Sequence, residues 1–177
     1  PCPAGHGTQR IGPLGAPQYR DYARSIHSSG RILLKSAEDA LAITNLLVKK
    51  PLPGITPTAS VCVAIDDMLS FHQAETQMLN LNLELDLCDA LEVVGEAQTL
   101  RQILINLMSE AIENAEPGSA VTVHGSAHRE EVHISLNVGT SRRKLNAHDE
   151  SFNMILARTL SQLTDGRLVE HCGEDNW

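Results

Sequence analysis

Residues 100–118 read LRQILINLMSEAIENAEPG, and this stretch decides the fold. Apolar side chains recur in it at steps of three and four residues, which is typical of a helix with one buried face. Pro117 and Gly118 end the pattern, because proline and glycine stop a helix. The opposite face carries four polar residues spaced so that they can line one cleft: Asn106, Glu110, Glu113 and Asn114.

The composition limits the class of protein. A chain of 177 residues suits one domain, or one domain with a helical appendage. Hydrophobic residues make up 42% and aromatic residues only 3%, so the core must be aliphatic. The net charge of −8, with no basic stripe, argues against nucleic acid as a partner, since such binding neutralises phosphates. We find no apolar run near the roughly 20 residues of a membrane span, and no signal-peptide core.

The thiols and imidazoles do not form a recognisable metal motif. Four cysteines lie far apart without a CxxC pair, and eight histidines are scattered without ligand spacing, so we expect no metal site. Cys62 stands in an apolar run and Cys88 at the end of an alternating one. We therefore expect buried thiols and a cytoplasmic, reducing location.

The N-terminal part is expected to be helical. Residues 1–17 are rich in proline and glycine and are interpreted as an irregular tail, followed by a helix domain over 18–50 whose helix ends at about residue 48. Small or apolar residues repeat through this helix with a heptad rhythm, which favours a bundle or a coiled-coil-like seam. Gly30 lies in its middle, so it needs a partner, and we expect a homodimer through residues 18–48 or packing on its own sheet domain. Prolines make 51–58 a linker.

Residues 59–177 are expected to form an α/β sandwich, so the fold class is α+β with an N-terminal bundle helix. A strand is predicted over 59–65, a helix from 66 to about 80, and a strand over 81–87 that alternates leucine with polar residues. A short strand at 91–94 precedes the 100–118 helix. A hairpin over 120–126 and 132–138, a helix over 151–164 and a last strand over 167–172 complete the order, which predicts helices on one face of a mixed sheet.

Two stretches resemble the sensor histidine kinases of two-component systems. LRQILINLMSEAI resembles their N-box helix, usually LRQILLNLLSNAIKFT, and IGPLGAPQYRDYARSIHSSGRILL resembles the second helix of a dimerisation and phosphotransfer domain. The resemblance implies the Bergerat fold, in which the N-box helix lines a pocket for ATP and Mg²⁺. The family's phosphoacceptor motif, SHELRTPL, is not found in this sequence. His27 matches a residue of the second helix and is the one candidate phosphoacceptor that we retain.

The sequence departs from the family at the nucleotide pocket. Asn106 matches the first asparagine of the N-box, but Glu110 replaces the metal-binding second one and Glu113 replaces a basic residue. The adenine-reading box D-x-G-x-G matches residues 137–141 and keeps Gly139, with Asn137 in place of the aspartate. The glycine-rich box GLGLAI matches 151–155, where Ser151 and Asn153 bring side chains to positions that phosphates need. Together with Asn114, these residues form an expected vestigial pocket.

Three functions are compatible with these patterns. The first, which we favour, is a regulatory module that has lost ATP binding and binds a response-regulator receiver domain or another kinase, with no cofactor and no catalytic residue. The second is a histidine phosphotransfer protein using His27. The third is a divergent active kinase in which Glu110 holds Mg²⁺, since a carboxylate is a good magnesium ligand. The acidic face of the 100–118 helix is also compatible with a plain solvated surface.

Overall fold

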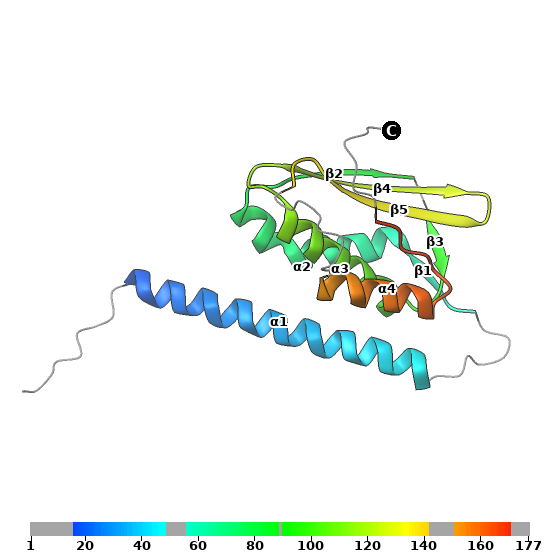
Figure 1. The fold of residues 1–177 in the computed structure, drawn as a ribbon, viewed down its shortest axis with the longest axis horizontal. Helices are drawn as coiled ribbons and strands as arrows, with labels where there is room; N and C mark the ends of the chain where they lie inside the picture. Colours follow the sequence, from blue (N-terminus) through cyan, green and yellow to red (C-terminus); the bar gives the residue numbers. More distant parts are fainter. Residues whose placement is uncertain (1–15, 49–55, 89, 142–150, 171–177) are drawn as a thin grey trace, which may run out of the picture. The chain divides into compact units, whose positions relative to one another are not determined.

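The computed structural model describes residues 16–48, 56–88, 90–141 and 151–170. The chain divides into two compact units, Pro1–Glu38 and Asp39–Trp177, which are described separately. Helix α1 (Ala16–Val48) makes up the described part of the first unit and continues into the second (Figure 1). In the described part of the chain, no helix combines the length and the apolar character that a membrane span requires.

Helix α1 confirms the helix predicted from residue 18 to 48. The part of α1 that belongs to the first unit exposes large apolar side chains. Among them are Ile26, Leu33 and Leu34, which are 73%, 71% and 55% exposed. A helix that exposes leucine and isoleucine in water is stabilised by a covering partner rather than by its own propensity. Of the tail predicted over 1–17, residues 16 and 17 are instead the first residues of α1, and residues 1–15 lie outside the described residues, as do residues 51–55 of the predicted linker.

The second unit is built on a three-stranded mixed sheet with helices on one face (Figure 1). Its strands are β2 (Asn82–Leu87), β4 (Ala120–His128) and β5 (Glu131–Val138), in the order β2-β4-β5, parallel between β2 and β4 and antiparallel between β4 and β5. Strands β1 (Thr58–Ser60) and β3 (Glu92–Val94) form a separate antiparallel pair. The helices are α2 (Val61–Met78), α3 (Ala97–Asn114) and α4 (Phe152–Leu163). The predicted sandwich is therefore confirmed.

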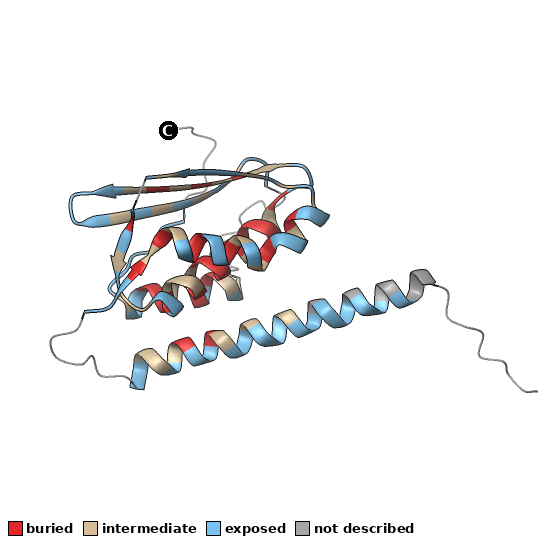
Figure 2. Cartoon of the chain, turned by 180° about the vertical axis from the view of Figure 1, so that it is seen from behind, coloured by how far each residue is buried: buried red, intermediate tan, exposed pale blue. Residues whose placement is uncertain are grey.

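The core lies between these helices and the sheet. Leu104, Ile105 and Met108 of α3 are at most 1% exposed, and they face Val121 and Val123 of β4 across one continuous hydrophobic cluster. Figure 2 shows the buried residues concentrated on the helix faces that point toward the sheet and toward one another. The buried face predicted for residues 100–118 is thus the centre of the core, although the helix ends at Asn114, a few residues earlier than predicted.

The strand predicted over residues 59–65 is confirmed only at residues 59 and 60, which belong to β1, and is wrong from Val61 on, where α2 begins. Ser60 is the N-cap, and its side chain accepts a hydrogen bond from the Val63 amide (3.5 Å). The run VCVAI contains β-branched residues that favour a strand. In the structure its buried members, Val61, Ala64 and Ile65, instead follow helical spacing. Tertiary packing against α3 outweighs the local propensity, as it often does for short apolar runs.

Two further sequence predictions need correction: the last strand and the burial of the cysteines. Residues 167–170 are not in a strand, and the rest of the predicted last strand lies outside the described residues. Here the Arg158 guanidinium donates to the Leu168 carbonyl (3.3 Å), so a helix side chain binds this backbone. Cys88 is exposed and Cys62 only half-buried, contrary to the expected buried thiols, because Cys88 follows the edge strand β2.

We expect Leu104→Ala to lower the free energy of unfolding by about 2–5 kcal/mol, because it leaves a cavity at the centre of the core. Leu85→Ala removes the same atoms from a side chain that is 49% exposed, and should cost less than about 1 kcal/mol. Urea unfolding followed by circular dichroism measures both. Equal losses in the two variants would contradict the assignment of α3 as the centre of the core.

Candidate functional site

The start of α4 is bound to α3 by a buried glutamate. Glu110 is 8% exposed; one carboxylate oxygen accepts a hydrogen bond from the Asn114 amide (2.7 Å), and the other accepts from the Ser151 hydroxyl. Ser151 is the N-cap of α4, and its hydroxyl oxygen also accepts from the Met154 amide (3.2 Å). The cap that begins α4 is therefore bound directly to a carboxylate of α3.

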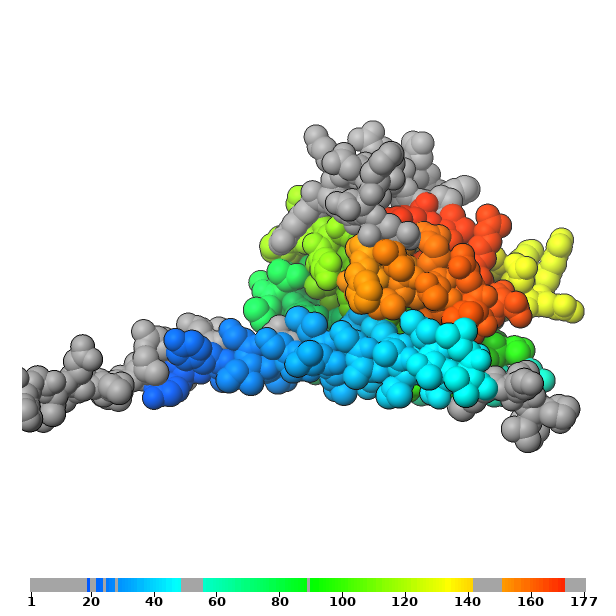
Figure 3. Space-filling view, turned by 60° about the horizontal axis from the view of Figure 1, so that its bottom comes forward, coloured from blue at the N-terminus to red at the C-terminus, as the bar shows by residue number. Residues whose placement is uncertain are grey.

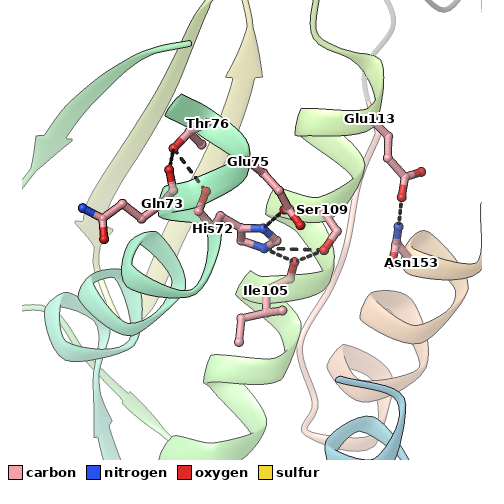
Figure 4. A network of polar contacts seen from close by, with 8 residues as sticks. All are labelled: His72, Gln73, Glu75, Thr76, Ile105, Ser109, Glu113 and Asn153. Atoms are coloured by element: carbon pink, nitrogen blue, oxygen red, sulfur yellow. Dashed lines mark hydrogen bonds and ion pairs between the residues drawn. The ribbon is translucent and has the colours of Figure 1, made fainter. Parts of the chain in front are cut away.

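A second glutamate of α3 makes a parallel contact one turn further on. The Asn153 amide donates to the Glu113 carboxylate (3.1 Å; Figure 4). Because the N-terminus of a helix carries a partial positive charge, two carboxylates near the start of α4 are electrostatically favourable. We call Glu110, Glu113, Ser151 and Asn153 the α3–α4 contact. Helix α4 lies at the surface of the second unit (orange in Figure 3).

Asn106 is fully buried, and its side chain forms hydrogen bonds within the chain. Its side-chain amide donates to the Asp39 carboxylate (2.8 Å) and to the Gln102 carbonyl (2.9 Å). Asp39, the first residue of the second unit, is only 2% exposed. Sequence reasoning missed Asp39, because an acid on an amphipathic helix is normally interpreted as part of its solvated face.

Asn137 lies on the solvent side of the sheet, away from the α3–α4 contact. Exposed and half-buried residues alternate along β5, and Leu136 and Val138 on either side of Asn137 pack against the core. The Gly139 amide donates to the Ala120 carbonyl (2.9 Å), and a Cβ built at Gly139 would lie 3.4 Å from that oxygen. The structure thus brings together five predicted pocket residues but not Asn137: Glu110, Glu113, Asn114, Ser151 and Asn153. Residues 142–150, between the two boxes, lie outside the described residues.

A buried histidine links α2 to α3, and sequence reasoning missed it. His72 is 2% exposed; one ring nitrogen lies 2.9 Å from the Glu75 carboxylate and the other 3.2 Å from the Ile105 carbonyl (Figure 4). Ser109 lies 3.5 Å from the second nitrogen and donates to the Ile105 carbonyl. The spacing in the sequence could have indicated that His72 is buried, because it follows the buried Met68 by four residues, about one helical turn. These contacts satisfy a buried imidazole and hold two helices together.

The other candidate residue, His27, is exposed on α1 in the first unit. Within the described residues, no group of three or more histidine, cysteine, aspartate or glutamate side chains could hold a metal ion.

We expect Glu110→Ala to lower the free energy of unfolding by about 1–3 kcal/mol, because it removes the acceptor from the Ser151 hydroxyl and the Asn114 amide in a buried place. Glu113→Ala is the matched control: Glu113 is exposed, so its loss should cost about 0.5 kcal/mol or less. Urea unfolding measures the difference. If the two variants were equally stable, the Glu110 contact would not be what holds α4.

Comparisons with known proteins agree with the fold. No family model matches the chain. The chain is 28% identical over 122 residues to the non-motile and phage-resistance protein of Caulobacter vibrioides, covering 69% of this chain and 14% of that protein. It is 26% identical over 121 residues to the cell-division control histidine kinase PdhS of Brucella canis, covering 67% of this chain and 11% of the kinase. The chain thus spans a small part of these relatives.

Solved histidine kinases share the fold. The Acinetobacter baumannii kinase AdeS matches with a TM-score of 0.58 at 12% identity, over 85% of this chain and 75% of that one. Full-length ShkA, solved with AMPPNP, matches with a TM-score of 0.58 at 16% identity, over 82% of this chain and 34% of that one. The nucleotide-free catalytic domain of ThkA matches with a TM-score of 0.54 at 14% identity, over 61% of this chain and 81% of that one. In sequence the chain is therefore similar to a histidine kinase of cell-division control, and in structure it has the fold of histidine kinase catalytic domains.

Proposed function

We propose that this chain is a signalling module that keeps the histidine kinase fold, does not bind ATP, and acts by binding other proteins of a two-component system. The observation that chiefly supports this proposal is the α3–α4 contact. Glu110 and Glu113 point at the start of α4, where the resemblance to the family places the phosphates of the nucleotide. In this chain, two carboxylates of α3 lie beside the place that an anion would need.

The residues of this site do not fit Mg²⁺-ATP. Both oxygens of Glu110 already accept hydrogen bonds, from Asn114 and Ser151, so coordinating a metal would cost buried interactions. Glu113 adds a negative charge next to the phosphate position. A like charge at about 4 Å costs about 4 kcal/mol at an effective dielectric constant of 20, before solvent screening. We therefore derive no catalytic step through ATP.

Partner binding is proposed to involve α1. The resemblance of α1 to the second helix of a dimerisation and phosphotransfer domain supports a response-regulator receiver domain, or another kinase, as the partner. The exposed apolar side chains of α1 in the first unit, including Ile26, Leu33 and Leu34, supply a surface for self-association or docking. We propose that the chain forms a homodimer through residues 18–48 and regulates a phosphorelay without catalysing phosphoryl transfer.

Mg²⁺-ATP is expected to leave the melting temperature unchanged. A ligand at a hundred times its dissociation constant stabilises a protein by about 2.7 kcal/mol, which corresponds to roughly 5–10 °C for a domain of this size. A melting scan in millimolar Mg²⁺-ATP, or in a non-hydrolysable analogue, should show no such shift. A clear upward shift would contradict the proposal and favour a divergent active kinase.

A double variant tests whether charge is what excludes the nucleotide. Glu110→Asn with Glu113→Lys restores the metal ligand and the basic residue that the family usually has, and calorimetric titration with Mg²⁺-ADP should then detect weak binding. Adding Asn137→Asp serves as the comparison, and we expect little further gain because Asn137 lies on the solvent side of the sheet. Binding that stays undetectable even with Ser151→Gly and Asn153→Gly would mean that steric filling, not charge, excludes the nucleotide.

Leu33→Asp with Leu34→Asp is expected to convert a dimer into monomers, because each change places a charge in the apolar stripe of α1. Static light scattering after size-exclusion chromatography measures the mass. Ser29→Asp with Ser36→Asp adds the same charge at exposed polar positions of α1 and should leave the mass unchanged. A mass that is the same for the wild-type chain and the leucine variant would contradict dimerisation through this helix.

A further inference from the structure

Strand β2 is an open edge of the sheet. Among the described residues it pairs with β4 alone, so the backbone N–H and C=O groups on its other side have no strand partner. Its sequence, NLELDL, contains no proline and no lysine, two residues that often protect an edge from another strand, and its charged residues, Glu84 and Asp86, are both acidic. The edge is therefore available for pairing with an extended peptide.

A groove runs beside the beginning of this edge. It has a volume of about 880 Å³ and lies between the outer side of α2 and the start of β2. Leu69, Leu81 and Leu83 supply its apolar lining, and serine, threonine, glutamine and asparagine side chains supply the rest, without a charged residue. Leu85 continues the apolar side of the strand and is 49% exposed. A peptide at the edge would find apolar surface on this inner side.

The solvent side of the same strand is acidic. Glu84 and Asp86 are both exposed and are held in place by neighbours on the sheet. The Thr122 hydroxyl donates to Glu84 (3.4 Å), and a ring nitrogen of His124 lies 2.9 Å from the Asp86 carboxylate. Residues directly opposite one another on paired strands interact, so opposite charges stabilise a pair and like charges destabilise it. A strand added here would be favoured if it placed basic residues beside Glu84 and Asp86.

We propose that β2 is a docking edge for an extended segment of a partner protein in which basic and apolar residues alternate. The apolar residues would cover the leucines of the inner side and the basic residues would face the two carboxylates. A second copy of this chain is disfavoured as the occupant, because pairing β2 with β2 would bring Glu84 and Asp86 opposite like charges in either direction. The net charge of −8 favours a basic partner as well. This proposal goes beyond the proposed function, since it does not depend on whether ATP binds.

A synthetic peptide of alternating lysine and valine tests the proposal. The probe is a fluorescein-labelled peptide of three lysines and three valines, titrated with the full chain and followed by fluorescence anisotropy. We expect saturable binding. A peptide of the same composition with the lysines in one block and the valines in the other should bind at least about tenfold more weakly, because it cannot present one residue type to each side of the strand.

Variants of the chain separate edge pairing from general attraction to an acidic protein. Glu84→Lys with Asp86→Lys should weaken binding at least about tenfold, whereas Glu92→Lys with Glu130→Lys changes the net charge equally at exposed positions outside β2 and should stay within about twofold of the wild-type chain. Circular dichroism checks that both variants are folded. Hydrogen exchange should slow at the amides of β2 when the peptide is bound.

Each contrary result overturns the proposal. Undetectable binding at millimolar peptide, equal binding of the block peptide, or equal weakening by the two charge variants would mean that β2 does not select such a strand. Leu85→Lys places a charge on the inner side of the edge and should also weaken the probe. If instead Leu85→Lys dissociated a dimer of the wild-type chain, the occupant of the edge would be a second copy, and the proposed partner would be wrong.

Discussion

Helix α3 supplies the central buried side chains of the core of the second unit. Leu104, Ile105 and Met108 are nearly inaccessible to solvent, and each contributes about 1.5–3 kcal/mol by leaving water. Helix α2 and strand β4 pack into the cluster at whose centre these residues lie, and α4 packs against α3 itself. Because one helix is shared by the whole core, its polar face has a fixed position relative to α4 and to the sheet.

Buried polar groups determine how α3 sits against its neighbours. His72 of α2 contacts the Ile105 carbonyl, and Asn106 donates to Asp39. A buried polar group that loses its partner costs about 1–3 kcal/mol, so such contacts disfavour a shift of α3 along its axis. Hydrophobic burial by itself is not directional, and these bonds supply the direction that it lacks.

The α3–α4 contact stabilises the fold, and under the proposed function the same charges also disfavour a nucleotide. Glu110 and Glu113 stabilise the start of α4 through Ser151 and Asn153, at the end of the helix where a negative charge is favourable. The same positive helix end is what an anionic ligand would use. We therefore propose that the carboxylates of α3, which are part of the chain, occupy the electrostatic environment that a phosphate of a nucleotide would need.

The sequence by itself determined the parts that follow from periodicity and strong local signals. The apolar spacing of α3, the alternation in β2 and β5 and the heptad rhythm of α1 predicted these elements, because regular side-chain spacing reflects a buried face directly. The sandwich with helices on one side of a mixed sheet followed from their order. Only the tertiary structure decided that Val61 begins a helix, since a short apolar run is compatible with both strand and helix until its neighbours are known.

Contacts between residues distant in the sequence were likewise decided by the tertiary structure alone. Ser151 meets Glu110, and Asp39 meets Asn106, across 41 and 67 positions of the chain, and no local pattern encodes such a pair. Asn137 carried the residue type expected of an adenine acceptor, yet the alternation of β5 turns it to the solvent side. Residue type and spacing could be predicted along the chain, whereas the direction of a side chain relative to a distant helix depends on how the layers pack.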